Sequence, residues 1–491
     1  MKNKFNPTIN GPALSIGWRA KGKFLSVAAL FLGLCLPASA QVPQGWQKLT
    51  GQAKNYSGVT DGITGDRENS YAWSMAFHGG YLYVGTSRDI VGQVLVRMPT
   101  PPNPWPVDVP VPTDLRGRIC RMKLDKSVPT WELFYLPPQL QNQMDLGYRM
   151  MKEFTSTSGK PVLYVGGAGR PYCQMLAIDS QQKTAVPIFT ATALSVRAMA
   201  EYKNQFFWAS EINKQPTIWY SSDPLKEYTL NPATQYDKIT VPNDWFTGAD
   251  GAEILDIVPF NNVMYVFFFN HDWDHAGFWC AELSKVKGNW HWELIVGDQT
   301  KGAKYPAGMG RPENGGATPF IFKDKMYVGT ISTTMWRFLL TGYMDPNNIP
   351  PTGTQLFRFD KKDKWERVMP PSSVTDETWV EAINGFANPL NLYLWRFAEQ
   401  SGKLYAGTFD ARIALEEVGM DLSSLTLWNP KGFDLYSTTD GNFWMPEALD
   451  GFQDQFNYGA RTLLTDPSSG DLYLGTANPF YGCQVWRKKA K

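Results

Sequence analysis

The chain has 491 residues, of which 43% are apolar and 14% aromatic, and its 47 basic side chains nearly balance its 46 acidic ones. Charged residues make up only 19% of the chain, which argues against intrinsic disorder. A near-neutral charge with no basic block excludes the electrostatic footprint of a nucleic-acid-binding protein. The 43 Gly, 35 Pro and 19 Trp indicate many turns and many strands packed through aromatic side chains.

The first forty residues have the pattern of an export signal. Five basic residues precede an apolar run from Phe24 to Leu36, and the small residues Ala38-Ser39-Ala40 follow it. The run has about 13 residues, which is too short to span a bilayer of roughly 30 Å as a helix. We therefore expect residues 1–40 to be a signal peptide and the product to be periplasmic or extracellular. The remaining chain has 42 basic and 46 acidic residues, a charge of −4, and no segment apolar enough to span a membrane.

One short phrase recurs seven times in residues 41–491: an apolar strand, a polar turn, and a strand that ends in an aromatic residue, Val, Gly and Thr or close variants. Gly, Asn and Asp in the turns, as at Gly79-Gly80 and Asn261-Asn262, allow the positive φ of tight hairpins. Repeats of about 40–50 residues with extra length in loops are typical of β-propellers. The copies are YLYVGT (81–86), VLYVGG (162–167), QFFWAS (205–210), VMYVFF (263–268), KMYVGT (325–330), KLYAGT (403–408) and DLYLGT (471–476).

A third apolar strand follows each hairpin, often with a fourth led by Trp, so the predicted fold is an all-β, seven-bladed β-propeller in residues 41–491. After the seventh hairpin only a third strand remains, Gln484-Val485-Trp486. The segment Gly45-Trp46-Gln47-Lys48-Leu49 matches the missing fourth strand. We expect it to pair with the C-terminal blade and close the ring, which removes an exposed sheet edge. A pair of smaller β-domains is the alternative.

The LYVGT hairpins and the turn STTDGNFW (Ser437–Trp444) resemble those of secreted bacterial β-propellers of the Asp-box, sialidase-like kind. The turn is one residue shorter than the usual S-x-D-x-G-x-x-W and occurs once. The resemblance covers nearly the whole chain after residue 40 at the level of architecture, while no enzyme family's catalytic motif matches in full. It implies a carboxylate clamp of three arginines, as sialidase-like enzymes use.

Polar residues at the blade ends define a candidate binding site. In a propeller, the residues before each first strand and after each Gly-Thr converge on one rim over the central channel. Arg149, Arg197 and Arg461 hold similar positions in YRMM, VRAM and ARTL. Three guanidinium groups near one axis would repel one another unless they share an anion or alternate with carboxylates. The alternative to a binding site is therefore a structural role, in which each arginine forms an ion pair with an acidic residue of a neighbouring blade. The other candidate ligand-binding residues are Arg88, Asp89, Arg170, Glu253, Glu313 and Asp410.

Three connections between second and third strands are long and are expected on the same rim: 87–117, 331–355 and 409–433, the last with a short helix around 415–422. Loops of this length are commonly functional. Their aromatic residues would either form stacking walls for a sugar or anchor the loops themselves.

Histidine and cysteine give two further predictions. The segment NHDWDH (270–275) could hold a divalent metal through His271, His275 and Asp272, and a hydrogen-bonded loop is the alternative. No other cofactor is expected, because the chain has no Walker loop, Rossmann fingerprint or nucleophile elbow. One or two disulfides, or buried thiols, are expected among the cysteines that remain after cleavage, Cys120, Cys173, Cys280 and Cys483.

Together these features predict an exported β-propeller that binds an extracellular or periplasmic ligand, a glycan or another anionic small molecule, on its loop-rich face. One alternative is a sialidase-like or lyase-like carbohydrate-active enzyme, which needs the three arginine heads within about 8 Å of one another and free of carboxylate partners. Another is a scaffold that docks envelope proteins through an exposed apolar patch. Whether the chain is an enzyme stays open at this point.

Overall fold

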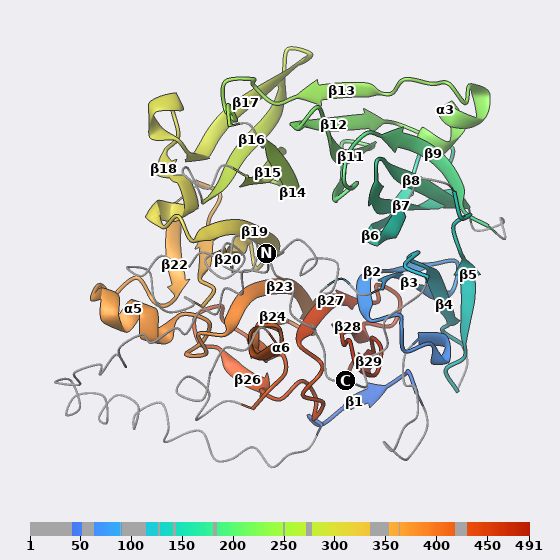
Figure 1. The fold of residues 1–491 in the computed structure, drawn as a ribbon. Helices are drawn as coiled ribbons and strands as arrows, with labels where there is room; N and C mark the ends of the chain where they lie inside the picture. The colour runs from blue at the N-terminus through green and yellow to red at the C-terminus, as the bar shows by residue number, and fades with distance from the viewer. Residues whose placement is uncertain are drawn as a thin grey trace, which may run out of the picture. The chain divides into compact units, whose positions relative to one another are not determined.

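β-Strands make up most of the regular structure in the computed structural model of the chain (Figure 1). The structure describes residues 42–51, 63–88, 90, 114–125, 128–140, 144–179, 184–248, 251–271, 277–333, 353–362, 364–417 and 430–491. The predicted signal peptide therefore lies outside the described residues. None of the described helices combines the length and the hydropathy that a membrane crossing needs. The all-β prediction is confirmed.

The strands follow one another in antiparallel meanders. The first three meanders contain β2 (Tyr71–His78), β3 (Tyr81–Ser87), β4 (Ile119–Lys123) and β5 (Trp131–Tyr135); β6 (Met144–Thr155), β7 (Pro161–Arg170), β8 (Cys173–Asp179) and β9 (Val186–Ala191); and β10 (Ala198–Tyr202), β11 (Gln205–Ile212), β12 (Gln215–Ser221) and β13 (Asp237–Thr240).

The later meanders repeat this connectivity. They contain β14 (Ala252–Phe260), β15 (Val263–Asn270), β16 (Phe278–Val286) and β17 (Asn289–Gly297), with the short β18 (Tyr305–Pro306); β19 (Asn314–Phe322), β20 (Lys325–Ser332), β21 (Leu356–Phe359) and β22 (Trp365–Met369); β23 (Asn391–Gln400), β24 (Lys403–Asp410), β25 (Leu435–Thr438) and β26 (Met445–Ala448); and β27 (Gly459–Thr465), β28 (Leu472–Ala477) and β29 (Val485–Lys488).

Each of the seven recurring phrases forms the second strand of a meander: β3, β7, β11, β15, β20, β24 and β28. The turns before five of them have the predicted pair of positive-φ residues, with φ of 55° and 80° at Gly79 and Gly80, and 54° and 65° at Asn261 and Asn262. Positive φ at both central residues twists a two-residue hairpin in the same sense as its strands. The local sequence therefore fixes the register of these hairpins.

The N-terminal strand β1 (Trp46–Lys48) lies antiparallel to β29, with Trp46 opposite Lys488 and Lys48 opposite Trp486. This is the pairing that the Trp-led pattern predicts. Single residue pairs also link neighbouring meanders, so that β1–β9 and β19–β29 form one hydrogen-bonded sheet, beside a sheet of β10–β13 and one of β14–β18. Among the described strands, no sheet closes on itself through hydrogen bonds.

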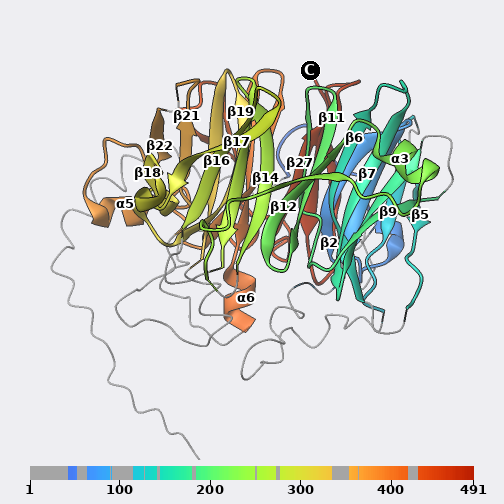
Figure 2. The same cartoon turned by 90° about the horizontal axis from the view of Figure 1, so that it is seen from above.

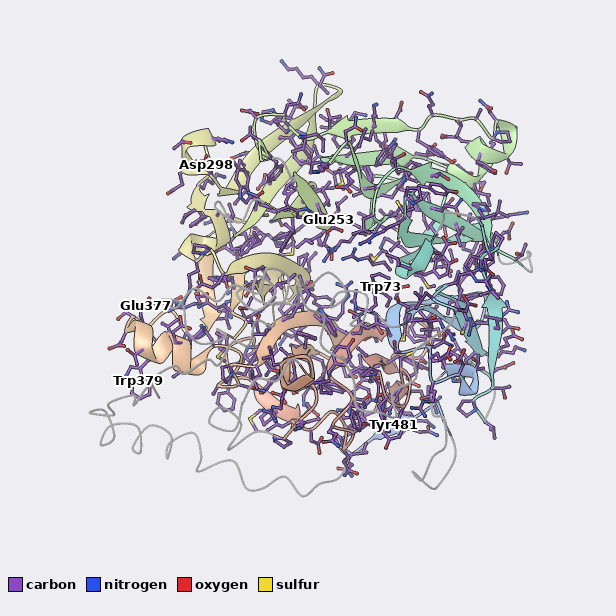
Figure 3. The ribbon with its side chains drawn as sticks, in the orientation of Figure 1. Trp73, Glu253, Asp298, Glu377, Trp379 and Tyr481 are labelled. Atoms are coloured by element: carbon purple, nitrogen blue, oxygen red, sulfur yellow. The ribbon has the colours of Figure 1, made fainter. Side chains whose placement is uncertain are left out.

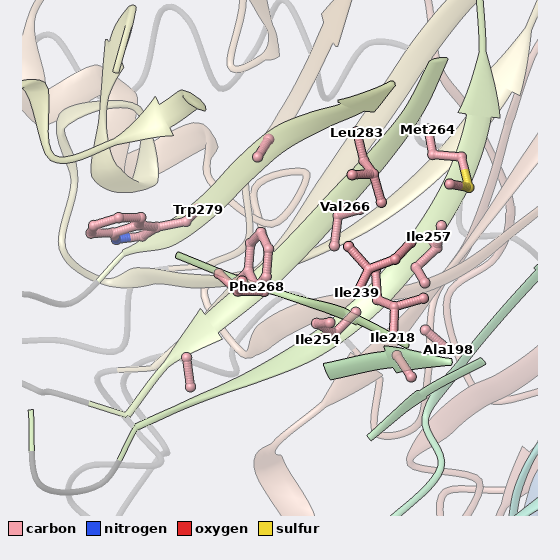
Figure 4. Packing of buried hydrophobic residues seen from close by; sticks show 14 of the residues in the cluster. Ala198, Ile218, Ile239, Ile254, Ile257, Met264, Val266, Phe268, Trp279 and Leu283 are labelled. Atoms are coloured by element: carbon pink, nitrogen blue, oxygen red, sulfur yellow. The ribbon is translucent and has the colours of Figure 1, made fainter. Parts of the chain in front are cut away.

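Hydrophobic clusters fill the spaces between successive meanders. Figure 4 shows one of them, in which Ile218 and Ile239 of one sheet pack against Ile254, Val266 and Phe268 of the next. The first and last meanders share such a cluster as well, made of Met75 and Leu82 on one side and Tyr473 and Val485 on the other. Apolar burial of this kind supplies roughly 25 cal/mol per Å² of area removed from water.

Short helices occupy some connections. They are α3 (Pro224–Leu230), α5 (Glu377–Ile383) and α6 (Arg412–Glu417), with 3-10 turns at Ile63–Gly65, Gln299–Lys301 and Ala307–Gly310. Helix α6 begins three residues before the helix expected around 415–422, in the described part of the third long connection. Figure 2 shows α6 beyond the ends of the strands. Most of the connections 87–117 and 331–355 falls outside the described residues.

The described residues show the buried-thiol form of the cysteine prediction, and no disulfide is found among them. Cys120, Cys173, Cys280 and Cys483 are all buried, and none of them forms a disulfide. Cys173 and Cys280 belong to different hydrophobic clusters, and only Cys120 and Cys483 share one. Burial raises the pKa of Cys120 to about 12 and that of Cys173 to about 11, so these thiols behave as small apolar side chains.

The turn that resembles an Asp-box joins β25 to β26. Asp440 Oδ1 accepts hydrogen bonds from the backbone N–H groups of Asn442 at 2.8 Å and Phe443 at 2.9 Å. Gly441 has a φ of 76°, and a Cβ at this position would lie 1.8 Å from the hydroxyl of Tyr327. The turn is thus a structural element that packs against the neighbouring meander, and the sialidase-like resemblance stays a prediction.

Candidate functional site

The first strands of the meanders carry the site, because β-bulges redirect their side chains. In six of them the register with the second strand slips by one residue, and in β6 and β23 it slips twice. A bulge leaves one residue unpaired and turns its side chain to a new direction. Neighbouring first strands contact one another, including β2 with β6, β23 with β27 and β27 with β2. The residues that these slips leave unpaired include Trp73, Arg149, Leu255, Trp395 and Arg461.

Arg149, Leu255 and Arg461 line a cavity that we call the arginine pocket, and Trp73 and Trp395 contact its arginines. Its empty volume is about 290 Å³, which includes open solvent. In Figure 3, Glu253 and Trp73 both lie where the first strands approach one another. The pocket is lined by Arg149, Arg197, Leu255, Asp256, Ala317, Thr318, Tyr393, Arg396 and Arg461. The structure therefore brings together the three arginines that the repeat register singled out.

Arg149 and Arg197 share one carboxylate. Nη1 of Arg149 lies 3.2 Å from Oε1 of Glu253, and Nη1 of Arg197 lies 2.7 Å from Oε2. The hydroxyl of Ser195 lies between them, accepting from Arg149 Nη1 at 2.9 Å and donating to Glu253 Oε1 at 3.3 Å. Although burial opposes ionisation of Glu253, the two guanidinium groups outweigh it and lower the pKa of this carboxyl to about 2. Both oxygens of Glu253 are thus occupied.

Arg461 has no such partner. Its side chain is 6% exposed, and among the described residues no carboxylate forms an ion pair with it. Its Nε is buried without a hydrogen-bond acceptor. The guanidinium carbon lies 5.4 Å from the ring centroid of Tyr71 and 5.3 Å from that of Trp395, so cation–π contacts hold the group in place. Burial lowers the pKa of Arg461, but a guanidinium stays protonated at neutral pH.

Sequence reasoning missed two charged residues of the pocket, Asp256 and Arg396. Each directly follows a bulged residue, Leu255 or Trp395, so simple alternation along the strand assigns it to the wrong face. Arg396 is half-buried, and the described residues show no hydrogen bond between it and a carboxylate. Burial raises the pKa of Asp256, and the positive charge of Arg396 opposes this.

An aromatic layer lies directly beside the arginines. Tyr71 contacts Trp73 and Trp395 edge to face, each at 5.7 Å between ring centroids. Arg149 lies 5.4 Å from the Trp73 ring. The apolar side chains of helix α6, Ile413 and Leu415, belong to the same cluster. The aromatic rings thereby form a rigid apolar support for the guanidinium groups.

The remaining predicted ligand-binding residues do not line the pocket. Arg88 is 2% exposed and forms ion pairs with Asp66, at 2.8 Å, and with Glu68. Glu313 pairs with Arg311 at 2.5 Å. Arg170 ends β7 and is exposed. Asp89 lies outside the described residues.

Of the predicted metal ligands, only His271 is described, and its ring lies 5.3 Å from that of Phe269. His275 and Asp272 lie outside the described residues. Within the part of the chain that the structure describes, no three His, Cys, Asp or Glu side chains form a group that could hold a metal ion. The metal site stays a prediction.

Asp410 lies in a buried hydrogen-bonded network at the end of β24. Its side chain is 2% exposed and accepts the backbone N–H of Arg412 at 2.7 Å. The neighbouring Asp434 accepts from the side chains of Asn388 and Asn391 at 3.2 and 2.6 Å. Burial raises the pKa of Asp410 to about 7 and that of Asp434 to about 6. Both carboxyls therefore titrate close to neutral pH.

The Asp410→Asn variant should lose part of the pH dependence of stability. An unfolded Asp titrates near pH 4, so between about pH 4 and pH 7 the folded chain holds a proton that the unfolded chain releases. The free energy of unfolding of the wild type then falls as pH rises through this window, by up to about 1.4 kcal/mol per pH unit. Urea unfolding at pH 4, 5.5 and 7 should show the variant gaining stability relative to the wild type as pH rises.

The exposed Asp237 on β13 offers a matched control, because Asp237→Asn removes a carboxyl outside any buried network. Its stability should follow that of the wild type across the same pH range. If the stability of Asp410→Asn also changes with pH in the same way as that of the wild type, the buried carboxyl does not hold the predicted proton.

Known proteins resemble the chain only distantly. No protein-family model matches it, and no curated protein sequence matches it. Among solved structures, the β-propeller domain of the trilobed protease from Pyrococcus furiosus is 8% identical, covers 86% of this chain and 96% of its own, and has a TM-score of 0.40. U3-55K is 10% identical over 91% and 98%, with a TM-score of 0.41. A GH43 β-1,3-galactosidase is 9% identical over 88% and 93%, with a TM-score of 0.30. Similarities at this level say nothing about the ligand or activity of this chain.

Proposed function

We propose that the chain is an exported seven-bladed β-propeller that binds an anionic ligand in the arginine pocket. The blade number is supported by the seven recurring second strands. Closure is supported by the pairing of β1 with β29 and by the hydrophobic cluster shared by the first and last meanders. Export is supported by the sequence of residues 1–40.

The state of Arg461 carries the functional proposal. Burying a guanidinium is costly unless an anion or strong acceptors compensate it. Arg149 and Arg197 meet that requirement through Glu253, whereas Arg461 has no carboxylate partner among the described residues. A protein that keeps such a group beside a cavity presents a binding site for an anion from outside.

Binding of sulfate, of glucuronate as an acidic sugar, and of glucose as a neutral sugar tests this proposal by calorimetry at constant ionic strength. The mature protein should bind the anions and not glucose. Arg461→Gln should weaken anion binding at least about tenfold, because a charged hydrogen bond is worth roughly 1.5–3 kcal/mol. Absence of anion binding by the wild type at millimolar concentration, or equal binding by the variant, would refute the proposal.

Arg121→Gln is the matched control for this experiment. Arg121 pairs with Glu132 at 2.5 Å on the outer strands β4 and β5, away from the pocket lining. Its replacement removes one positive charge without changing the pocket, so anion affinity should match that of the wild type. Any general effect of net charge on binding would appear in both variants.

The two alternatives have less support. The sialidase-like or lyase-like enzyme needs three arginines free of carboxylates, and Glu253 holds two of them. The envelope scaffold needs an apolar patch on the long connections, most of which fall outside the described residues. Exposed Leu133, Leu136 and Leu140 lie instead on β5 and the segment after it.

A further inference from the structure

The charges around the arginine pocket indicate what kind of anion it accepts. Four guanidinium groups line it, those of Arg149, Arg197, Arg396 and Arg461. Glu253 compensates one charge of the first pair, and Asp256 compensates at most one more. The described lining therefore keeps an excess of two positive charges when both carboxylates are ionised.

The size of the pocket restricts the ligand to a compact group. The empty space between the lining residues is about 290 Å³ even with open solvent counted, so the enclosed part of the pocket is smaller still. The Trp395 and Tyr71 rings hold the Arg461 guanidinium, so the pocket cannot widen by moving that side chain away without losing both contacts. The charged group itself, rather than a whole sugar, fits this space.

We propose that the arginine pocket is selective for a compact oxyanion with two negative charges, either free sulfate or phosphate or the terminal group of a phosphate monoester. This inference rests on the proposed function and narrows it to one ligand class. Arg461 and Arg396, from the neighbouring strands β27 and β23, supply N–H donors that no carboxylate among the described residues occupies. A monoanion such as a carboxylate would leave one of the two excess charges uncompensated in a poorly solvated site.

Sulfate and perchlorate provide the sharpest comparison, because both are tetrahedral oxyanions and differ by one charge. Calorimetric titrations of the mature protein at constant ionic strength should show sulfate binding about tenfold or more tightly than perchlorate. Acetate should behave like perchlorate. Glucose 1-phosphate set against inorganic phosphate separates the two sources of the dianion: tighter binding of the ester indicates a terminal group on a larger ligand, and equal or weaker binding indicates the free ion.

The Arg396→Gln variant tests the charge argument with little risk to folding, because Arg396 is only half-buried. It should narrow the difference between sulfate and perchlorate affinity, whereas the control Arg121→Gln should leave it unchanged. Sulfate also stabilises proteins generally by exclusion from their surfaces, and that effect would be the same in all variants.

The outcomes separate the two levels of the proposal. If no anion binds, the proposed function itself fails. If anions bind but perchlorate or acetate matches sulfate, the pocket binds anions without selecting their charge, and the dianion inference is overturned. If Arg396→Gln keeps the full preference for sulfate, the excess charge does not arise from this arginine and the inference is likewise wrong.

Discussion

Glu253→Gln should lower the free energy of unfolding by about 3 kcal/mol, because it leaves Arg149 and Arg197 beside each other without a shared counter-charge. Removing one member of a buried ion pair costs roughly 3–5 kcal/mol. The low end applies, since the Arg149, Arg197 and Glu253 side chains keep exposures of 14%, 18% and 19%. Denaturant unfolding at neutral pH and low salt measures the loss.

The same variant should respond more strongly than the wild type to added sulfate. With Glu253 neutralised, the pocket gains one further uncompensated positive charge, and a ligand that binds only the folded chain raises its stability by mass action. We therefore expect sulfate to restore much of the lost stability. A variant as stable as the wild type, or one indifferent to sulfate, would contradict this description of the pocket.

Acid should mimic Glu253→Gln in the wild type. The pKa of Glu253 is depressed to about 2 in the folded chain, so its contribution to stability is complete above about pH 4.5. That contribution is lost as pH falls from about 4.5 towards 2. Glu366→Gln is the control, because Glu366 is 45% exposed and its pair with Arg358 on the outer strands is worth at most about 1 kcal/mol.

Trp46→Ala should destabilise the protein by roughly 3–5 kcal/mol, the usual cost of truncating a buried aromatic residue. Trp46 is 8% exposed on β1 and packs against Phe452 with ring centroids 5.1 Å apart. It belongs to one hydrophobic cluster with Trp486 of the partner strand β29. Thermal and urea unfolding measure the loss, and hydrogen exchange should show faster opening of β28 and β29.

Phe443→Ala is a suitable control for Trp46→Ala. Phe443 is 58% exposed on the turn before β26, and surface substitutions of this kind usually change stability by no more than about 0.5 kcal/mol. A loss below about 1 kcal/mol for Trp46→Ala would show that β1 contributes little to the folded chain. The proposed closure of the ring through this strand would then lack its energetic basis.

Local patterns were sufficient to predict the hairpins and the partner of β1. In five of the seven hairpins two successive turn residues have positive φ and determine the turn. The Trp-led segment around Trp46 indicates a strand whose partner is missing from its own part of the sequence. The convergence of Arg149, Arg197 and Arg461 followed from their equivalent places in the repeat. Such inferences succeed because each blade buries the same face in the same register.

What the sequence could not show depends on bulges and on partners from distant blades. A bulge at Leu255 or Trp395 shifts the in–out alternation of side chains along the strand by one residue. Asp256 and Arg396 therefore line the pocket, although strict alternation of side chains would place them on the other face of the sheet. Glu253 is the carboxylate that Arg149 and Arg197 share. Predicting this contact would require the relative positions of three separate chain segments, which the sequence does not give. Arg88 was expected in the site, but acidic residues upstream of β2 pair with it instead.

Anomalous diffraction from crystals of the mature protein soaked in selenate tests the central claim most directly, since selenate has the shape and the charge of sulfate. We expect a selenium peak inside the arginine pocket, within hydrogen-bonding distance of Arg461 and Arg396, that disappears in Arg461→Gln. A pocket without selenium at saturating selenate, while the ion occupies other places on the surface, would contradict the account.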